Sequence, residues 1–392
     1  MSRSKALIAM SGGVDSSVSA YLMKQLGYDP IGVTMMLHDQ DAASVYGTHT
    51  CCTPDDIEDA RVVSSHLGIP FHVVNFMDGF KEKIIDKFIN TYLLGHTPNP
   101  CIDCNRFMKF GKLFEMAEAE GCEKVVTGHY ATVEYNPEEG IYRLKRGVDR
   151  TKDQTYVLYF LSQEQLARLV FPLGEYEKTE VRRIAEEQGL IVASKHDSQD
   201  ICFVPDGDYA GYIEREAEGQ VDEALEDARE LVRKQEEPDK SHKSETKYGK
   251  FLDIDGNILG THKGYYHYTI GQRRGLGIAA EHPLYVVNII PKTNQVILGS
   301  EDLLFRRNVT ATDFNLISLP TRYKTMNDDV IKMRVTAKVR YRAKDTSGVL
   351  TLYSDGRAEM LFDEPVRAVT PGQSLVVYDG DYCLGGGVIN EG

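Results

Sequence analysis

The residues best placed to do chemistry begin near the N-terminus, in the run Ser11-Gly12-Gly13-Val14-Asp15-Ser16-Ser17. An apolar, strand-like stretch at residues 5–10 leads into this run, and a helix-like stretch at 14–26 follows it. The two glycines let backbone N–H groups approach phosphate oxygens, the hydroxyls add donors, and the helix N-terminus is electropositive. The run therefore predicts a phosphate site, in which Asp15 would serve as a partner of Mg²⁺.

Two common nucleotide-binding patterns are absent from this loop, the G-x-x-x-x-G-K-[ST] loop and the G-x-G-x-x-G fingerprint. Their absence disfavours kinases of the first kind and dehydrogenases of the second. A Ser-Gly-Gly turn can also be only a tight strand-to-helix connection. The string SGGVDSS, however, resembles the pyrophosphatase loop of the N-type ATP pyrophosphatases. That resemblance implies that ATP adenylates a carbonyl oxygen while the loop holds the pyrophosphate.

Cysteines in polar surroundings form a second reactive group. Cys101 and Cys104 lie in the run TPNPCIDCNR, where a loop enters a predicted helix, and Cys202 follows much later in SQDICF. A thiol at a helix N-terminus with Arg106 and Lys109 nearby deprotonates more readily than an isolated thiol, so it is a competent nucleophile. The remaining cysteines are interpreted as structural: Cys51, Cys52, Cys122 and Cys383.

The elements that must position these residues alternate through the first half of the chain. Strands are predicted at residues 5–10, 31–37, 71–75 and 124–127, and helices at 14–26, 53–67, 102–120 and 178–188. The helix at 53–67 has clear start signals, with Thr53 as N-cap and Pro54 in its first turn. This alternation predicts an α/β domain with a parallel sheet, ending near Pro205.

The second half of the chain changes in character twice. Residues 214–250 are charged, with Val221, Leu225, Ala228 and Val232 at helical spacing, and we interpret them as an amphipathic helix and a mobile loop in a solvated insertion. Short strands are then predicted at 251–253, 266–270, 284–290, 295–298, 332–342, 349–352, 358–362 and 374–378, with Asp-Gly turns at 255–256, 355–356 and 379–380.

The predicted fold class is therefore α/β, with a parallel-sheet ATP pyrophosphatase domain followed by a small central β-rich domain and a C-terminal β-barrel-like domain. The expected boundaries are 1–207, 208–302 and 303–392. A length of 392 residues with 42% hydrophobic content is enough for two or three packed domains.

Composition also limits the possible cellular location and partners of the protein. The apolar run at residues 6–10 is too short for a signal peptide or a membrane span, so we expect a cytoplasmic protein whose seven cysteines are thiols. A net charge of −14 repels nucleic acid, so an RNA partner would need a segregated basic surface.

Such a surface is predicted at residues 332–344, where almost every second side chain is a cation. The cations, which we call the basic stripe, are Lys332, Arg334, Lys338, Arg340, Arg342 and Lys344. A period of two puts these six charges on one face of a strand or bent strand pair. A lysine-protected edge strand is the alternative, but it does not require six cations in register, so we favour RNA contact, which Arg273 and Arg274 could extend.

Seven longer strings carry a narrower resemblance, in order along nearly the whole chain: TPNPCIDCNRFMKFG, TGHYA, KDQTYVLY, DSQDICFV, GYYHYTIGQRRGLG, VRYRA and AVTPGQSLVVYDGDYCLGGG. They resemble the tRNA-specific 2-thiouridylases. In that family ATP adenylates the C2 oxygen of the wobble uridine, in tRNAs for Lys, Glu and Gln, and sulfur then replaces the oxygen. The resemblance implies ATP, Mg²⁺, tRNA and a sulfur donor or carrier protein, and no membrane.

Matched position by position, the resemblance implies roles for individual residues. Cys104 would be the catalytic nucleophile and Cys202 would carry the incoming sulfur as a persulfide, so that the two end as a disulfide. The positions implied for ATP are Ala9, Met10, Ser11, Gly12, Gly13, Val14, Asp15, Ser16, Met35 and Gly128. Those implied for the target base are Asn99, Pro100 and Cys101. Those implied for tRNA are His129, Lys152, Asp153, Gln154, Arg340, Tyr341 and Gln373.

At one position this chain differs from some members of the family, and the difference leaves two routes of sulfur transfer open. Some family members carry Asp where this chain has Cys101, so Cys101, Cys104 and Cys202 could together hold a [4Fe–4S] cluster that delivers sulfur, although we favour the persulfide. Two other functions also stay open. The first is an ATP pyrophosphatase that acts on a small metabolite, in which the cysteines and the basic stripe would have no function. The second is an iron–sulfur RNA-binding module, which would leave the string SGGVDSS unexplained.

Overall fold

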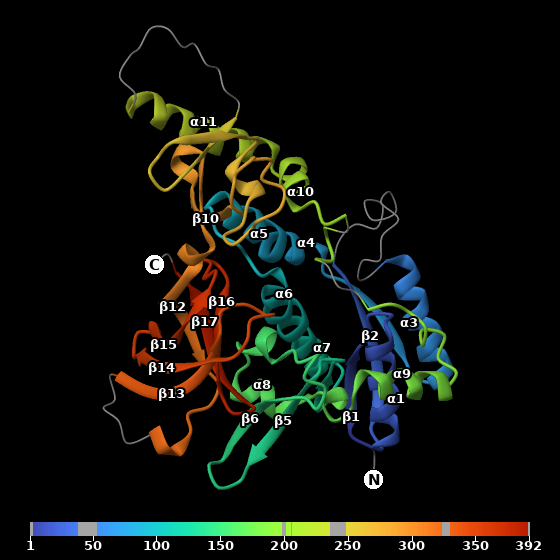
Figure 1. The fold of residues 1–392 in the computed structure, drawn as a ribbon. Coiled ribbons are helices and arrows are strands. Elements are labelled where there is room, and N and C mark those ends of the chain that lie inside the picture. The colour runs from blue at the N-terminus through green and yellow to red at the C-terminus, as the bar shows by residue number, and fades with distance from the viewer. Residues whose placement is uncertain are drawn as a thin grey trace.

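The computed structural model describes residues 3–37, 53–197, 201–204, 206–235, 248–323 and 330–390. Figure 1 shows three parts: an N-terminal α/β domain, a small central domain beside the long helix α11 (Glu218–Gln235), and a C-terminal β-barrel. The predicted fold class is confirmed. A search of the described residues finds no helix that is long and apolar enough to cross a lipid bilayer.

A five-stranded parallel sheet forms the centre of the N-terminal domain, with its strands in the order β3-β2-β1-β4-β7. The strands are β1 (Lys5–Ala9), β2 (Asp29–Met36), β3 (Phe71–Asn75), β4 (Lys124–Val126) and β7 (Leu169–Val170). The side chains of β1 alternate between two cores, because Leu7 packs into one core and Ile8 into the other. The strand order reverses at β1, and ligands of α/β proteins bind at such a point.

Helices cover both faces of this sheet. One face carries α1 (Val14–Gln25), α3 (Pro54–Leu67) and α9 (Lys178–Glu187), which agree with the predicted helices to within one residue. The other face carries α4 (Met77–Phe80), η1 (Lys81–Ile85), α5 (Asp86–Leu93), α6 (Pro100–Asp103), η2 (Cys104–Lys112) and α7 (Leu113–Ala119). Thr53 forms a capping box with Asp56 at the start of α3, as its sequence signals indicate. The helix expected at 102–120 begins earlier, at α6, and winds partly as a π-helix in η2.

The central domain is built on a four-stranded sheet in the order β10-β11-β8-β9. Its strands are β8 (Gly249–Leu252), β9 (Ile258–His262), β10 (Tyr285–Ile290) and β11 (Gln295–Gly299). The strand expected at 266–270 is wrong, because Tyr265–His267 form a 3₁₀ turn, η5. Tyr265 and Tyr266 are both buried, whereas a strand would turn consecutive side chains to opposite faces.

The charged insertion is not a solvated appendage. It begins at the end of α10 (Tyr209–Glu216) and contains α11, whose apolar residues Val221, Leu225 and Ala228 are at most 6% exposed. α11 packs against the turn η6 (Pro291–Thr293) of the central domain. The sequence revealed the apolar stripe, but it could not reveal the surface that covers it. Other predictions concern parts of the chain that the structure does not describe. These are the side chain of Val232, the predicted mobile loop within 236–247, Pro205, and the cysteines at 51–52.

Six strands of the described chain close the C-terminal barrel, because β12 pairs with both β15 and β17. They are β12 (Phe305–Leu316), β13 (Val330–Lys338), β14 (Thr346–Tyr353), β15 (Ala358–Arg367), β16 (Ser374–Asp379) and β17 (Tyr382–Ile389). The predicted Asp-Gly turns at Gly356 and Gly380 join two of its hairpins, with φ values of 82° and 59° that favour glycine. An N-terminal hairpin, β5 (Ala131–Asn136) and β6 (Ile141–Arg146), joins the same sheet through β17, which the sequence did not predict.

The basic stripe is only partly a strand. β13 ends at Lys338, so Arg340 and the cations after it lie in the connection to β14. The expectation that six cations lie on one face of a strand or bent strand pair is therefore wrong. Within β13, Arg334 is exposed but forms a bidentate pair with Asp363, at 2.5 and 3.0 Å. This pairing leaves less unpaired positive charge on the strand than the sequence pattern suggests.

The substitution Leu225→Ala tests the packing of α11. Because Leu225 is 5% exposed within the core, its truncation should lower the free energy of unfolding by about 2–3 kcal/mol. Leu26→Ala is the control, because Leu26 is 67% exposed and its truncation should change that free energy by less than about 0.5 kcal/mol. Urea unfolding followed by circular dichroism measures both. Equally small losses would mean that α11 is a solvated insertion.

Candidate active site

The phosphate loop, residues 11–17, joins β1 to α1 at the carboxyl edge of the parallel sheet. Gly12 has a φ of 70°, and a Cβ there would lie 2.1 Å from the carbonyl oxygen of Asp56, so only glycine fits. The backbone N–H of Ser11 donates to Ser16 Oγ at 3.1 Å, which closes the loop over the first turn of α1. The first N–H groups of an α-helix have no partner inside the helix, so those of α1 can bind an anion.

Other positions implied for ATP surround this loop. β2 and β4 flank β1, so Met35 and Gly128 come from strand ends beside the loop. A Cβ on Gly128 would lie 3.0 Å from backbone atoms of Asp15 and Ser16, so the two backbones touch. Met10 is 1% exposed and belongs to the core. The structure therefore brings these positions together, with Met10 as a packing residue.

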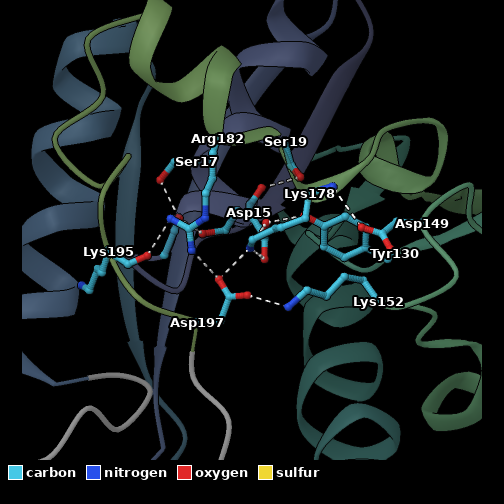
Figure 2. Close-up of polar contacts among 12 residues, drawn as sticks. Asp15, Ser17, Ser19, Tyr130, Asp149, Lys152, Lys178, Arg182, Lys195 and Asp197 are labelled. Atoms are coloured by element: carbon cyan, nitrogen blue, oxygen red, sulfur yellow. Dashed lines mark hydrogen bonds and ion pairs between the residues drawn. The ribbon is translucent and has the colours of Figure 1, made fainter. Parts of the chain in front are cut away.

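A network of ion pairs beside the phosphate loop was not predicted from the sequence (Figure 2). Lys178, the first residue of α9, donates to both carboxylate oxygens of Asp15 at 2.7 and 2.8 Å and lies 2.8 Å from Asp197 Oδ1. Asp197 also accepts hydrogen bonds from Lys152 at 2.8 Å and from Arg182 at 2.9 Å. We call Lys152, Lys178 and Arg182 the cation cluster. It converges on one carboxylate next to the phosphate loop.

The surroundings fix the protonation of this network. Burial alone would raise the pKa of Asp197, but hydrogen bonds from Lys152 and Lys178 outweigh burial and lower that pKa to about 2. The hydroxyl of Tyr130 donates to Asp15 Oδ1 at 2.8 Å. Burial and the charge of Asp15 raise the pKa of Tyr130, so its hydroxyl keeps the proton that it donates. Asp197 is thus a carboxylate at neutral pH.

Residues 193–197 are tied to the phosphate loop a second time. Lys195 Nζ donates to the carbonyl oxygen of Gly12 at 3.0 Å. Arg182 donates to the carbonyl oxygens of Ala193 and Lys195 at 2.9 and 3.0 Å. This segment precedes Cys202 in sequence, so two contacts connect that part of the chain to the loop: the bridge of Lys178 between Asp15 and Asp197, and the hydrogen bond from Lys195 to Gly12.

Sequence reasoning missed most of these residues. Lys178, Arg182 and Lys195 stand in a helix and a turn without a local motif, so no signal in a single sequence marks them. Asp197 stands inside the string DSQDICFV, and an acidic residue just before a reactive cysteine was the one available signal.

The expectation that Asp15 binds Mg²⁺ is compatible with its surroundings only if phosphate is present as well. In the part of the chain that the structure describes, no group of three or more His, Cys, Asp or Glu side chains is placed to hold a metal ion. Mg²⁺ is usually bound by one or two carboxylates and completes its shell with phosphate oxygens and water. Asp15 fits that pattern because it lies at the phosphate loop, although its carboxylate pairs with Lys178 here.

The C-terminal domain holds the loop that precedes Cys101. Gln373 Nε2 donates to the carbonyl oxygens of Thr97 and Pro98, both at 3.0 Å. The N–H of Thr97 donates to the carbonyl oxygen of Pro371 at 2.9 Å. Gln373, implied for tRNA contact, therefore also positions the cysteine loop. The conformation of this loop depends on contacts from both the N-terminal and the C-terminal domain.

Several positions implied for tRNA and the base meet at this loop. Asn99 and Pro100 begin α6, which packs on η3 (Thr155–Leu158). The ring of Tyr341 lies 5.9 Å from that of Tyr156 in η3, and burial together with the charges of Asp153 and Cys101 raises the pKa of Tyr341. Cys101 is exposed and Tyr341 is 37% exposed. Both side chains can therefore be reached from solvent.

The run Lys152-Asp153-Gln154 is occupied by contacts within the protein. Lys152 belongs to the cation cluster, and Asp153, which is 8% exposed, accepts hydrogen bonds from the N–H and hydroxyl of Thr155 at 3.1 and 2.8 Å. Gln154 Oε1 accepts from the N–H of Tyr130 at 2.9 Å. These three side chains therefore support the region around the phosphate loop, a structural role that the sequence did not indicate.

Two other positions implied for tRNA make contacts inside the protein. His129 is 5% exposed, its ring centroid lies 5.8 Å from those of Phe110 and Phe171, and burial lowers its pKa well below the usual value. Arg340 is half-buried and donates to the carbonyl oxygen of Ile270 at 2.8 Å, and desolvation lowers its pKa. His129 thus fills the interior, and the guanidinium of Arg340 is engaged by the protein itself.

Cys104 and Cys202 are both half-buried and pack against the same core. The ring of Phe203, next to Cys202, lies 5.8 Å from Phe80 and 5.1 Å from Phe88, which anchors this part of the chain. Among the described residues the three cysteines of the proposed cluster are not gathered into a metal-binding group. The structure therefore does not fit a three-cysteine iron–sulfur cluster.

The pH dependence of stability tests the ion pairs of Asp197. Because its pKa in the folded state lies below the ordinary value of 3.8, its carboxylate stabilises the fold above about pH 4, and this contribution is lost as the pH falls toward 2. Asp197→Asn should therefore lower the free energy of unfolding by about 1 kcal/mol at pH 7, since solvent screens part of the interaction.

Thermal unfolding at pH 7, 5, 4 and 3 measures this effect. The difference between the wild type and Asp197→Asn should be constant from pH 7 to 5 and should shrink at pH 3. Asp86→Asn is the control, because Asp86 pairs with Lys81 at the surface and should matter little. A difference that does not change with pH would contradict the assigned ion pairs.

Comparisons with known proteins agree with one another along the chain. Family models match residues 4–206 (tRNA methyl transferase HUP domain), 241–300 (tRNA methyl transferase PRC-barrel domain) and 307–389 (Aminomethyltransferase beta-barrel domain). The tRNA-specific 2-thiouridylase MnmA of Clostridioides difficile strain 630 is 46% identical over 388 residues, covering 99% of this chain and 98% of the relative. That of Acetivibrio thermocellus is 45% identical over 390 residues, covering 99% and 100%. The chain belongs to the family of tRNA-specific 2-thiouridylases.

Proposed function

We propose that this protein uses ATP to replace the C2 oxygen of the wobble uridine with sulfur, in tRNAs for Lys, Glu and Gln. The observation that carries the proposal is the link between the phosphate loop and the segment before Cys202, made by Lys178 and Lys195. Full-length similarity to proteins named 2-thiouridylases supports the choice of uridine in tRNA as substrate.

The first step is adenylation of the uridine. The C2 oxygen attacks the α-phosphorus of ATP, an O–P bond forms, and the bond to the leaving pyrophosphate breaks. The N–H groups at the start of α1 and the ammonium of Lys178 are placed to stabilise the negative charge of the pyrophosphate. Asp15 would hold Mg²⁺, which neutralises phosphate charge when it is bound.

The second step moves sulfur from protein to tRNA. A sulfur donor or carrier protein loads Cys202 as a persulfide, and the thiolate of Cys104 attacks the Sγ of Cys202. A disulfide forms between the two cysteines and hydrosulfide leaves. The hydrosulfide attacks C2, the C–S bond forms, and AMP departs with the original oxygen. An external thiol reductant then supplies two electrons and restores both thiols.

The cysteine loop is suited to hold the target base. Asn99, Pro100 and Cys101 begin α6, and Gln373 of the C-terminal domain fixes the loop before them. Tyr341 is 37% exposed and contacts Tyr156 of η3, on which α6 packs, so an unstacked base could pack on the ring of Tyr341. A uridine delivered here would lie near Cys104, because Cys104 follows α6 directly.

The roles of the two thiols can be separated by assaying both half-reactions. Cys104→Ser and Cys202→Ser should retain tRNA-dependent release of pyrophosphate from ATP but form less than about 1% of the wild-type 2-thiouridine, because the sulfur step loses a nucleophile or a carrier. Pyrophosphate assays and nucleoside mass spectrometry measure the two steps. Thiolated product from Cys202→Ser with a protein persulfide donor would remove Cys202 as the carrier.

Cys101→Ser serves as the discriminating control in the same assays. The persulfide route needs two thiols, so this variant should still thiolate tRNA. A three-cysteine cluster would need all three, so loss of product together with iron and labile sulfide in anaerobically purified wild-type protein would favour the cluster route.

Charge reversal tests the exposed end of the basic stripe. Because Arg342 and Lys344 are exposed beyond β13, Arg342→Glu and Lys344→Glu should each weaken tRNA binding and reduce its salt dependence by about one phosphate contact, without changing ATP binding. Affinity measured over a salt titration shows both effects. Arg357→Glu, an equal charge change on an exposed hairpin of the same domain, is the matched control. An equal loss in the control would mean that net charge, and not a local contact, governs binding.

A further inference from the structure

Three cations lie close to one aromatic ring in the helix that carries Cys104. The ammonium groups of Lys83 and Lys87 lie 5.7 and 6.0 Å from the ring centroid of Phe107, and the guanidinium carbon of Arg106 lies 5.4 Å from it. The electron-rich face of an aromatic ring attracts a cation within about 6 Å, so the ring favours a gathering of like charges that would otherwise repel one another. We call these four residues the cationic patch.

The cationic patch keeps part of its positive charge. Lys87 donates to the carboxylate of Asp103 at 2.6 Å, which fastens α5 to the last residue of α6. Lys83 and Arg106 are exposed, and neither forms an ion pair with a carboxylate in the part of the chain that the structure describes. Phe107 packs against the core, so the ring that attracts these two cations is itself fixed. Lys83 and Arg106 are therefore available to an anion.

The cationic patch lies next to the residues proposed to hold the target base. α6 begins with Pro100 and Cys101, packs against η1 and continues into η2. The phosphates of a nucleotide are joined to its base through the sugar, so a uridine held at α6 must bring its own backbone close to the elements around α6. Two of these elements are η1, which carries Lys83, and η2, which carries Arg106. The backbone of an RNA strand could therefore reach the patch.

The charge of the whole chain gives such a patch a purpose. A net charge of −14 repels RNA, so binding depends on local groups of cations. The basic stripe provides fewer of them than its sequence suggests, because Arg334 pairs with Asp363 and the guanidinium of Arg340 donates to a carbonyl oxygen of the protein. The cationic patch adds two exposed cations on a different domain.

We propose that Lys83 and Arg106, gathered at the ring of Phe107, bind backbone phosphates of the tRNA strand that flanks the target uridine. Phe107 acts as a positioning residue, because it holds the two cations together before the RNA arrives. This inference rests on the proposed function, in which a uridine of tRNA is the substrate. Its consequence is that cations of both the N-terminal and the C-terminal domain bind the tRNA backbone.

The salt dependence of tRNA binding tests the proposal. Lys83→Gln and Arg106→Gln each remove one charge and keep a side chain of similar length. Each should raise the Kd for an unmodified tRNA transcript about fivefold at about 0.1 M salt and lower the slope of log Kd against log salt by about 0.7, as expected for one contact to a single-stranded phosphate. Fluorescence anisotropy over a salt titration measures both quantities.

Matched controls come from the same helical segments. Lys81→Gln in η1 and Lys112→Gln in η2 remove cations that are already paired, with Asp86 and Glu115. Both controls should bind tRNA within about twofold of the wild type. An equal loss of affinity in the controls would mean that net charge, and not the patch, governs binding, and would overturn the proposal.

The role of the ring has its own test. Phe107→Leu keeps an apolar side chain in the core but removes the attraction for cations, so it should raise the Kd about threefold without changing the slope. Phe107→Tyr keeps the ring and should restore the affinity of the wild type. Leucine and tyrosine variants that bind equally well would contradict the positioning role.

A second readout separates the patch from the thiols and from the sulfur donor. Release of pyrophosphate from ATP needs no thiol, so Lys83→Gln and Arg106→Gln should raise its KM for tRNA about fivefold and leave its kcat unchanged. A patch that binds an acidic sulfur-carrier protein would give a different result. Affinity and KM for tRNA would then be unchanged, and thiolation would fall with the protein donor but not with inorganic sulfide, which overturns the proposal.

The same assays distinguish this inference from the proposed function. If the wild type neither releases pyrophosphate in response to tRNA nor forms 2-thiouridine, the proposed function fails and the inference fails with it. If the wild type does both, and the two glutamine variants bind tRNA as their controls do, only the cationic patch is overturned.

Discussion

The sharing of one ammonium group between two carboxylates is the constraint on which the site depends. Lys178 can be buried at the start of α9 only because Asp15 and Asp197 accept its hydrogen bonds. These pairs connect parts of the chain that are far apart in sequence: the phosphate loop, the start of α9 and the segment before Cys202. Replacing any one of the three would leave an uncompensated charge next to the others, so they act as a unit.

A second constraint comes from the way the barrel and the α/β domain share elements. The hairpin β5–β6 leaves the α/β domain and pairs with β17, so strands from both domains share the barrel sheet, while the parallel sheet stays separate. Tyr156 is fully buried and its hydroxyl donates to the carbonyl oxygen of Ser374, next to Gln373, which fixes the cysteine loop. The geometry of the candidate active site is therefore set in part by a domain that contributes none of its reactive thiols.

The sequence predicts well what local patterns encode and poorly what only tertiary contacts decide. The capping signals at Thr53, the glycines of the loop and the turns at Gly356 and Gly380 depend on their own backbone, and the structure agrees with them. Alternation alone could not tell that β13 stops at Lys338 or that Arg340 turns inward. The pairing of Lys178 with Asp197 could not be predicted for the same reason, because ion pairs between distant segments leave no regular spacing in the sequence.

Charge balance explains how a chain with a net charge of −14 can serve polyanionic substrates. The cations nearest the phosphate loop are each paired with a carboxylate, so the site is close to neutral. Asp15 and Asp197 compensate the charges of the cation cluster, whose members would otherwise repel one another. A phosphate group in the loop would therefore meet donors that are already in place, and its binding would not require new ones to be assembled.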